Sequence, residues 1–427
     1  MSDAKDKIKK YNIPPYLKKV LILLSIVGPG LITANIDNDA GGIATYSLAG
    51  AQTGLRLLWT LIPITVALIM VQEMSARMGI VSGKGLADLI REKFGLKVTF
   101  YTLIFLIFAD LGNTMAEFAG IASAGEIFGV SKYISVPIAS LFVWLLIIKG
   151  DYKVVERVFL LGCTVYLSYI ISGFMMKPDW LEVAKATFIP NPGAITMQDM
   201  PIIVGLVGTS ITPWMQFYIQ SAVVEKGIKV RNLFESKIDI VVGCIFMVTV
   251  TIFIIICCAV NLHGAGIVIN DAKDAALALR PLAGDYSTIL FGIGLLNASV
   301  FAAALLPLAT SYYVCEGLGW ESGVDKSFEE APHFFTIFTA LIGVAAFFVL
   351  LPNINLFKIL IWSQVANGVL IPIILLYIIN LCNDSDIMGE YTNTRTYNII
   401  SYAIVALMIL VNGALIYFEA IAPLISY

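Results

Sequence analysis

Long apolar stretches alternate with short polar ones along almost the whole chain. A helix needs about 20 mainly apolar residues to cross the hydrocarbon core of a bilayer. Eleven segments meet this requirement, at residues 18–51, 55–80, 98–128, 133–149, 153–176, 201–225, 236–260, 284–315, 333–351, 354–381 and 396–423. The pattern predicts an all-α integral membrane protein with eleven transmembrane helices. The polar stretches 178–200 and 261–283 are predicted to be loops that each hold a short helix.

Composition and charge agree with this pattern. The 427 residues are 59% hydrophobic and 13% charged, about half the charged fraction of a soluble domain. The polar, Lys-rich start of the chain lacks the apolar core and the cleavage site of a signal peptide. The net charge of −3 is small and gives little information about partners. We therefore expect the lipid bilayer as the surroundings of this chain and no nucleic-acid partner.

The distribution of basic residues predicts the orientation in the membrane. Cytoplasmic loops of membrane proteins carry an excess of Lys and Arg. If the N-terminus lies inside the cell, most of the 27 Lys and Arg residues fall on the inner side. Eleven crossings then place the C-terminus outside. We expect a multi-pass protein of the cell membrane with a cytoplasmic N-terminus and an extracellular C-terminus.

The first apolar segment is interrupted by polar residues and glycines. The stretch TANIDNDAGG places Asp37, Asn38 and Asp39 where lipid would otherwise lie, and Gly41 and Gly42 follow. The glycine pair predicts a break in the helix at Asp39. A carboxylate at the centre of a bilayer costs at least about 2.5 kcal/mol and usually serves function. We expect Asp39 to be a site residue, with Asp37 sharing the site, lining an access path or capping the half-helix.

The sixth segment contains a second interruption. Its sequence, GLVGTSITPWMQFYIQ, places Pro213 after a run of small polar residues. Proline lacks the amide proton and clashes with the preceding turn of a helix. Unwinding here would free the backbone carbonyls near Gly208 and Thr209. Irregular backbone at membrane depth is tolerated only where protein or a water-filled cavity satisfies it.

The two broken helices lie five segments apart, at corresponding positions of two halves. This pairing indicates a transporter with inverted repeats and a binding site between them. The chain then divides into a cytoplasmic N-terminal segment (1–17), a first five-helix repeat (18–176), an extracellular loop (177–200), a second five-helix repeat (201–381), and a cytoplasmic loop with helix 11 (382–427). The broken pair favours alternating access over a channel.

An enzyme is not expected. The sequence contains no nucleophile placed beside a base, no phosphate-binding loop, and neither an HExxH nor a CxxC motif. The six cysteines lie in or beside apolar runs and are interpreted as small core residues. The only two histidines lie near predicted segment ends, which argues against a histidine-built metal centre. No cofactor is expected.

The stretch GPGLITANIDNDAGGIATYSLAGAQTGLRLLW resembles the first helix of the Nramp family, the natural resistance-associated macrophage proteins. That family carries GPG, then Asp-Pro-Gly-Asn, then AGAQxG and LLW. Supporting matches are AEFAG at 116–120, GLL at 294–296, EG at 316–317 and SQV at 363–365. The resemblance implies a leucine-transporter-like fold, with a 5+5 inverted repeat and broken helices 1 and 6. It also implies import of a divalent metal ion.

The resemblance also implies a set of ion ligands. In the family the ion is held by the Asp and Asn of helix 1, and by a backbone carbonyl and a methionine of helix 6. Carried over to this chain, Asp39 is a ligand and Gly42 stands at the Asn position. Thr209 supplies the carbonyl, and Thr212 stands at the methionine position. Gln364 of the tenth segment is a further candidate.

The departures from the family pattern favour a hard cation. Thr212 removes the soft thioether ligand, and oxygen ligands suit magnesium, calcium and manganese. Gly42 removes a second side-chain ligand and opens space. Mg²⁺ dehydrates reluctantly and keeps several waters, so we expect a partly hydrated Mg²⁺ as the transported substrate, with Mn²⁺ also accepted. Met215 lies close by and is interpreted as facing a neighbouring helix.

The family's proton relay is largely replaced. Thr114 stands at the position of an Asp in the third segment, and Gln220 at that of a histidine in the sixth, whereas Glu117 is retained. We expect transport without proton coupling, with Glu117, Asn38 and Trp214 as candidates for holding water or charge beside the ion. The alternatives are proton-coupled Mn²⁺ or Fe²⁺ transport as in the parent family, aluminium transport, and transport of an organic substrate.

Overall fold

The computed structural model describes residues 38–149, 166–280, 284–324 and 326–417. Within these ranges the chain forms helices, turns and loops, and no strand. Asp37, most of the first predicted segment and the first half of the fifth lie outside the described residues.

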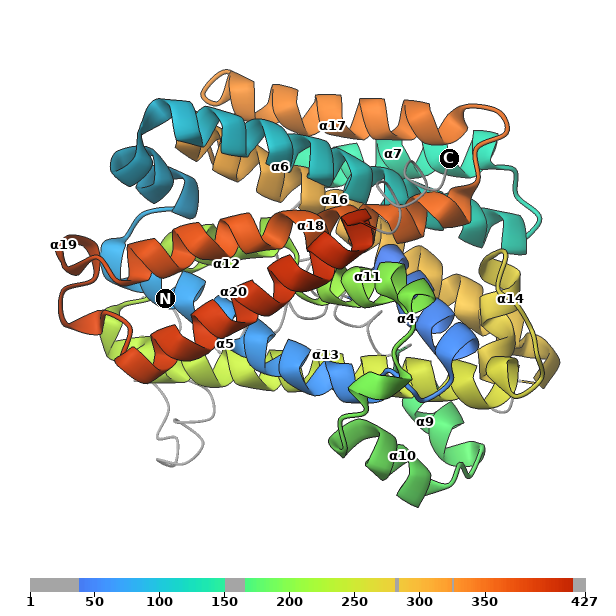
Figure 1. The fold of residues 1–427 in the computed structure, drawn as a ribbon. Coiled ribbons are helices and arrows are strands. Elements are labelled where there is room, and N and C mark those ends of the chain that lie inside the picture. The colour runs from blue at the N-terminus through green and yellow to red at the C-terminus, as the bar shows by residue number, and fades with distance from the viewer. Residues whose placement is uncertain (1–37, 150–165, 281–283, 325, 418–427) are drawn as a thin grey trace, which may run out of the picture.

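The helices follow the predicted apolar segments closely (Figure 1). The longer ones are α5 (Leu61–Ser82), α6 (Leu86–Ile127), α7 (Lys132–Lys149), α13 (Leu233–Cys258), α16 (Ser287–Leu318), α17 (Pro332–Leu350), α18 (Leu356–Cys382) and α20 (Arg395–Ile416). The shorter ones are α4 (Ala40–Thr53), α9 (Leu167–Met175), α10 (Trp180–Phe188), α11 (Met200–Ser210), α12 (Pro213–Glu225), α14 (Ala272–Ala276) and α19 (Ser385–Met388). In the described part, eight helical stretches are long and apolar enough to span a membrane, and α11 and α12 together form one of them.

The helices pack as two groups joined by α18. In the first group α6 packs against α7, α16 and α17, and α6 and α17 lie side by side at the top of Figure 1. In the second, α4 and α5 pack against α13, and α12 packs against α5. Helix α18 contacts α6 on one side and α4 and α11 on the other, and α20 covers α18 and α11. The short helices α4 and α11 therefore lie at the centre of the molecule.

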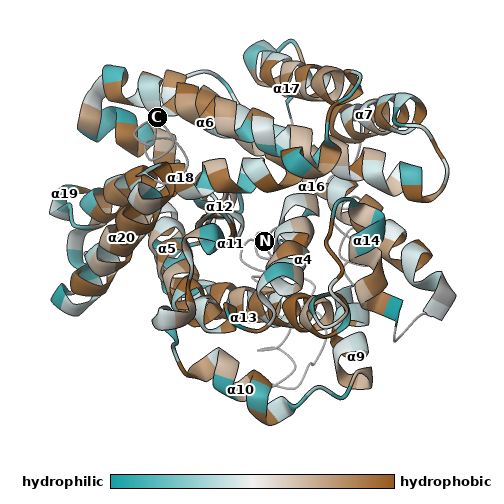
Figure 2. Cartoon of the chain, turned by 45° about the vertical axis from the view of Figure 1, so that its right-hand side comes forward, coloured by the Kyte–Doolittle hydropathy of each residue, from teal (hydrophilic) through white to brown (hydrophobic). Residues whose placement is uncertain are grey.

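Hydrophobic residues are found on the outer helices as well as on the central ones, as the colouring by hydropathy shows (Figure 2). On α6 Phe108 is 69% exposed, and on α20 Leu410 is 71% exposed. Further large apolar side chains are exposed on α7 and α17. A soluble monomer rarely exposes so extensive an apolar surface. These helices are membrane-spanning, and the protein is a multi-pass membrane protein.

The largest difference from the predicted boundaries is at the start of α6. The helix begins at Leu86 rather than near residue 98, and it bends at Gly95, whose φ of 81° is left-handed. Residues 86–94 carry several charges, so the apolar pattern begins only after the bend. The short helices predicted in the two polar loops are confirmed as α10 and α14.

Candidate ion-binding site

Helix α4 begins in the interior of the protein. Its N-cap is Asp39, whose backbone is extended (φ −69°, ψ −176°) and whose side chain is buried. The Asp39 Oδ1 atom accepts a hydrogen bond of 2.6 Å from the backbone N–H of Gly42. Aspartate is a favoured N-cap because its carboxylate satisfies a free amide of the first turn. The polar residues of the first segment thus start a helix at membrane depth.

The glycine pair does not break the helix as predicted. Gly41 and Gly42 lie inside α4, and the irregular backbone precedes them at Asn38 and Asp39. Gly41 instead permits close packing, because a Cβ added there would overlap the side-chain amide of Gln364. Gly42 contributes its amide to Asp39, as above.

Glu117 of α6 meets the same helix end. The backbone N–H of Ala40 donates to Glu117 Oε2 at 3.4 Å, beside Asp39, whose carboxyl group caps the same helix end. Glu117 is fully buried, and its Oε1 atom has no hydrogen-bond partner. Two carboxyl groups therefore share the N-terminus of α4, where the helix dipole favours negative charge.

Asn38 lies next to this pair and is fully buried. Its backbone carbonyl accepts a hydrogen bond of 2.7 Å from the hydroxyl of Tyr166. Neither its side-chain Oδ1 nor its Nδ2 has a partner. Buried polar atoms are nearly always hydrogen-bonded to protein, water or ions. The unpartnered carboxamide of Asn38 thus marks a place where water or a ligand completes the structure.

The second break lies between α11 and α12. Helix α11 continues through Gly208 and Thr209 to Ser210, and the irregular residues Ile211 and Thr212 precede Pro213, where the break was predicted. The last carbonyls of a helix have no partner within it. Residue 213 would donate to the Thr209 carbonyl in a continuous helix, but it is proline and has no amide proton. The break thus leaves this carbonyl without its helical partner.

Threonine hydroxyls line the same break. The hydroxyl groups of Thr209 and Thr212 are buried and have no hydrogen-bond partner. Thr212 is the N-cap of α12, yet its side chain makes no capping bond. A threonine at this position ordinarily accepts from an amide of the first turn. The Thr212 oxygen is therefore free to bind something else.

Gln364 of α18 lies between the two breaks. Its side-chain amide touches α4 at Gly41, and its backbone oxygen lies so close to Gly208 of α11 that no Cβ fits there. The Gln364 Oε1 atom accepts a hydrogen bond of 3.2 Å from Asn367, and its Nε2 donates to Ser363. The residue is thus placed at the site, with its amide nitrogen rather than its oxygen toward α4.

Two further residues of α12, Trp214 and Met215, contact other side chains. Met215 is fully buried and accepts a hydrogen bond through its sulfur from Gln72 of α5. It therefore faces a neighbouring helix, as predicted. Trp214 is also buried, and its ring lies 6.1 Å from that of Tyr218. No hydrogen bond links Trp214 to Asp39 or Glu117 in the part of the chain that the structure describes.

The donors gathered at the breaks are oxygen atoms. They comprise the carboxylates of Asp39 and Glu117, the Thr209 carbonyl, and the hydroxyls of Thr209 and Thr212. Among the described residues, no three His, Cys, Asp or Glu side chains converge as a metal centre. All the cysteines in that part of the chain are buried in the core, as predicted. A site of few charges and several neutral oxygens suits an ion that is bound weakly and released.

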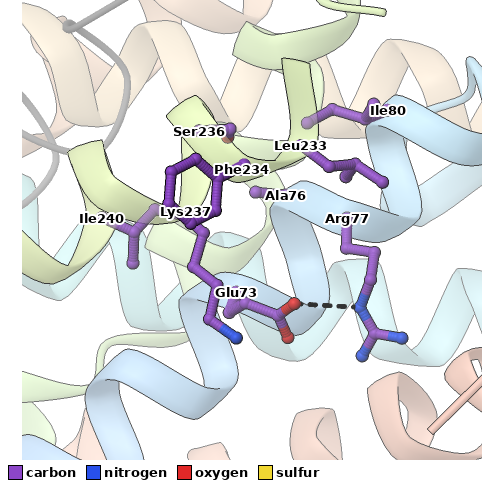
Figure 3. A pocket seen from close by; sticks show the side chains of 9 residues that line it. All are labelled: Glu73, Ala76, Arg77, Ile80, Leu233, Phe234, Ser236, Lys237 and Ile240. Atoms are coloured by element: carbon purple, nitrogen blue, oxygen red, sulfur yellow. Dashed lines mark ion pairs between the residues drawn. The ribbon is translucent and has the colours of Figure 1, made fainter. Parts of the chain in front are cut away.

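A pocket between α5 and α13 lies apart from this site (Figure 3). Glu73 and Arg77 of α5 form an ion pair of 3.1 Å in it, and Lys237 lies nearby. Arg77 also donates to the carbonyl of Tyr391 and to Asn393. The pocket's arginine thus ties α5 to the connection before α20, which is a structural role.

Sequence reasoning missed the polar residues around Gln364. Asp110 is fully buried in α6, and Asn113 and Asn367 are buried beside it. The same argument that selected Asp39, a carboxylate in an apolar segment, applies to Asp110.

The sequence is similar to known proteins over most of its length. Residues 30–418 match the family model described as natural resistance-associated macrophage protein-like. The "Divalent metal cation transporter MntH" of Yersinia pestis (strain Pestoides F) is 26% identical over 404 residues, which cover 92% of this chain and 95% of that protein. The protein of the same name from Deinococcus radiodurans is 24% identical over 410 residues, covering 92% and 90%. These relatives are named as transporters, not enzymes.

Solved structures agree in fold. The crystal structure of the Eremococcus coleocola manganese transporter in complex with an aromatic bis-isothiourea substituted compound superposes with a TM-score of 0.76 at 20% identity, covering 97% of this chain and 90% of that one. Mhp1, a nucleobase-cation-symport-1 family transporter, gives a TM-score of 0.56 at 15% identity, covering 91% of each chain. The fold is leucine-transporter-like, as predicted. From the match over nearly its whole length, the chain belongs to the Nramp family.

Proposed function

We propose that this protein is a secondary transporter that imports a divalent metal cation by alternating access. The preferred ion is Mg²⁺, bound with part of its water shell, and Mn²⁺ is also accepted. Asp39 supplies the charge, and the Thr209 carbonyl and the Thr212 hydroxyl supply neutral oxygens. Gly42 leaves space for water where a side-chain ligand would stand. Asp37 lies outside the described residues, and its contact with the ion remains part of the proposal.

One observation carries this proposal: buried oxygen atoms without partners collect around the two helix breaks. They are Asn38 Oδ1, Glu117 Oε1, Thr209 Oγ1 and Thr212 Oγ1. Each unpartnered buried polar atom costs about 1–3 kcal/mol, so four together are expected only where a ligand or water satisfies them. The relatives' names, divalent metal cation transporter and manganese transporter, support a metal ion as that ligand.

The chemistry of the donors supports a hard ion. Carboxylate, carbonyl, hydroxyl and water oxygens suit Mg²⁺, Ca²⁺ and Mn²⁺, whereas thioether sulfur selects softer metals. The methionine of α12, Met215, accepts a hydrogen bond through its sulfur from Gln72 of α5. Mg²⁺ retains several waters in most protein sites, and the unpartnered oxygens can accept hydrogen bonds from those waters.

Uptake into proteoliposomes tests this function. We expect saturable uptake of Mg²⁺ and Mn²⁺, with each ion competing against the other, and little inhibition by Cd²⁺ at equal concentration. Strong Cd²⁺ uptake that Mg²⁺ does not inhibit would contradict the oxygen-ligand argument. Absence of any divalent-cation uptake would contradict the function itself.

Replacement of Thr212 by methionine tests the ligand argument at one residue. Thr212→Met places a thioether at the break, and soft ligands favour softer metals. We expect the ratio of Cd²⁺ to Mg²⁺ uptake to rise about tenfold, a free-energy difference of about 1.4 kcal/mol. Thr212→Val is the matched control, because it removes the hydroxyl without adding sulfur. A similar rise in both variants would show that loss of oxygen, not gain of sulfur, sets the ratio.

We further propose that transport proceeds without proton coupling. The membrane potential alone contributes about 2.3 kcal/mol per elementary charge per 100 mV, enough to draw a divalent ion inward. The described site contains no histidine, and Gln220 donates to the backbone of Lys84 instead of acting as a proton carrier.

One observation favours the proton-coupled alternative. The carboxyl groups of Asp39 and Glu117 are both buried at the N-terminus of α4. Neighbouring buried carboxyl groups favour a protonated form of one of them, and an ion bound by Asp39 would displace that proton. A pH-sensitive dye inside the proteoliposomes separates the two readings. We expect no acidification during Mg²⁺ uptake. Acidification that tracks the rate of metal uptake would establish the coupled mechanism.

The membrane topology is part of the same proposal. The basic residues place the N-terminus in the cytoplasm and the C-terminus outside. The inverted repeats span 18–176 and 201–381, joined by an extracellular loop at 177–200. The segments 1–17 and 382–427 complete the chain. Cysteine labelling from the outside should then modify Asn191→Cys in the external loop and spare Lys326→Cys on the inner side.

A further inference from the structure

A chain of buried polar side chains leads away from Gln364 into the neighbouring helices. Asn367, one turn further along α18, donates its amide to Gln364 Oε1 at 3.2 Å. Asn367 and Asn113 of α6 form a reciprocal pair, with N–O distances of 2.8 and 3.1 Å. Asn113 also donates to Asp110 Oδ1 at 3.2 Å. These four residues, named here the Asp110 chain, connect the ion site to α6.

Asp110 anchors this chain at its far end. Its Oδ2 accepts hydrogen bonds from the hydroxyls of Tyr313 at 2.7 Å and Thr310 at 2.9 Å, both on α16. With Asn113 on Oδ1, each carboxylate oxygen has at least one donor. The residue is completely buried. A carboxylate at this depth is costly and usually functional, yet Asp110 has no free oxygen facing the ion site.

The charge of Asp110 gives the chain a direction. A carboxylate only accepts hydrogen bonds, so the amide nitrogen of Asn113 must face it. The Asn113 oxygen then accepts from Asn367, whose nitrogen in turn donates to Gln364. The Gln364 oxygen is therefore turned toward Asn367, and its nitrogen toward α4 at Gly41. Connected hydrogen bonds in a low-dielectric interior reinforce one another.

We propose that Asp110, Asn113 and Asn367 are positioning residues that set ion specificity by holding the Gln364 oxygen away from the ion. With its oxygen engaged, Gln364 does not replace a water molecule of the bound cation. The site then favours an ion that keeps its water. The inference rests on the proposed function, because it assumes that a divalent cation binds beside Gln364.

Release of Gln364 changes this preference. If a substitution interrupts the hydrogen bonds of the Asp110 chain, the carboxamide of Gln364 can rotate and offer its oxygen to the ion. Mn²⁺ and Ca²⁺ gain from an added protein ligand, whereas Mg²⁺ dehydrates reluctantly. Loss of the chain should therefore raise uptake of Ca²⁺ and Mn²⁺ relative to Mg²⁺. If the Asp110 chain serves packing alone, its loss should lower the amount of folded protein and change the uptake rates of all ions by the same factor.

The variant Asn113→Leu removes the hydrogen bonds of Asn113 in the Asp110 chain and leaves Gln364 itself unchanged. Leucine has nearly the shape of asparagine. We expect the ratio of Ca²⁺ to Mg²⁺ uptake to rise about tenfold, within the range of coupling between residues of one network. In a Gln364→Ala background the same substitution should change the ratio less than twofold. Ser311→Ala is the matched control, because the buried hydroxyl of Ser311 donates to the carbonyl of Pro307 within its own helix and does not belong to the Asp110 chain. It should leave the ratio unchanged.

Equal changes of the ratio in the wild-type and Gln364→Ala backgrounds would overturn the proposal, as would an unchanged ratio in Asn113→Leu. If Asn113→Leu does not fold, Asn367→Leu removes the next hydrogen bonds of the Asp110 chain. The same changes in the ratio of Ca²⁺ to Mg²⁺ uptake are then expected.

A second measurement separates this inference from the proposed function. In protein labelled with ¹⁵N-glutamine, the side-chain resonance of Gln364 reports its hydrogen bond to Asn367 without any metal, and Gln364→Ala assigns it. We expect Asn113→Leu to shift this resonance, and an unchanged resonance would overturn the positioning role. If the resonance shifts but the wild-type protein transports no divalent cation, the proposed function and the role in ion specificity are both wrong. The positioning of the Gln364 carboxamide by the Asp110 chain would still be supported.

Discussion

Asp39→Asn should reduce divalent-cation uptake to the level of empty liposomes while leaving the protein folded. Asparagine is as good an N-cap as aspartate, so the hydrogen bond to Gly42 is preserved. Only the charge is lost, and that charge is the one firm ligand of the proposed site. Because an ionised carboxylate is costly to bury, we expect the thermal unfolding temperature to stay equal or to rise.

The matched control for this variant is Asp179→Asn. Asp179 is the N-cap of α10, where its side chain accepts from Leu181 and Glu182. The same substitution there removes a capping charge outside the site. Uptake should remain at the wild-type level. Substantial uptake by Asp39→Asn would contradict the assignment of Asp39 as the ion's charged ligand.

Gly208→Ala should destabilise the protein and abolish transport. The new methyl group would overlap the backbone oxygen of Gln364 and the backbone nitrogen of Gly368. Backbone atoms cannot turn aside, so α11 must move away from α18. Overpacking of this kind costs about 1–3 kcal/mol, occasionally more, and it displaces the break that carries Thr209 and Thr212. Thermal unfolding monitored by size-exclusion chromatography measures the loss of stability, and uptake into proteoliposomes measures the loss of transport.

Gly343→Ala is the control for this substitution. Gly343 lies inside α17, and a Cβ added there meets nothing within 4 Å. Alanine is favoured over glycine in a helix by up to about 1 kcal/mol. We expect equal or higher stability and normal uptake. If Gly208→Ala behaves like Gly343→Ala, then close packing of α11 on α18 is not required.

The fold was largely predictable because membrane helices have a simple signal. A run of about 20 apolar residues is long enough to mark each span, and the described helices match the predicted segments. The charged first part of α6 was missed because it carries no such run. Pro213 correctly marked the second break, since a missing amide acts locally.

The details of the site were less predictable because they depend on contacts between distant segments. Gly41 was interpreted as part of a helix break, but it makes room for the side chain of Gln364 of α18, and Gly208 makes room for the backbone of the same residue. No local pattern reveals such an approach. Likewise, the sequence suggests Gln364 as a ligand, whereas the direction of its carboxamide depends on Asn367 and, beyond it, on Asp110 of α6. The sequence contains these residues but not their pairing.

The most direct test of this account is a structure of the protein with Mn²⁺ located by its anomalous scattering. We predict one strong peak between the Asp39 carboxylate and the Thr209 carbonyl, surrounded by oxygen atoms and water, with the Gln364 oxygen still bonded to Asn367. An ion bound away from Asp39, or one in contact with the sulfur of Met215, would contradict it.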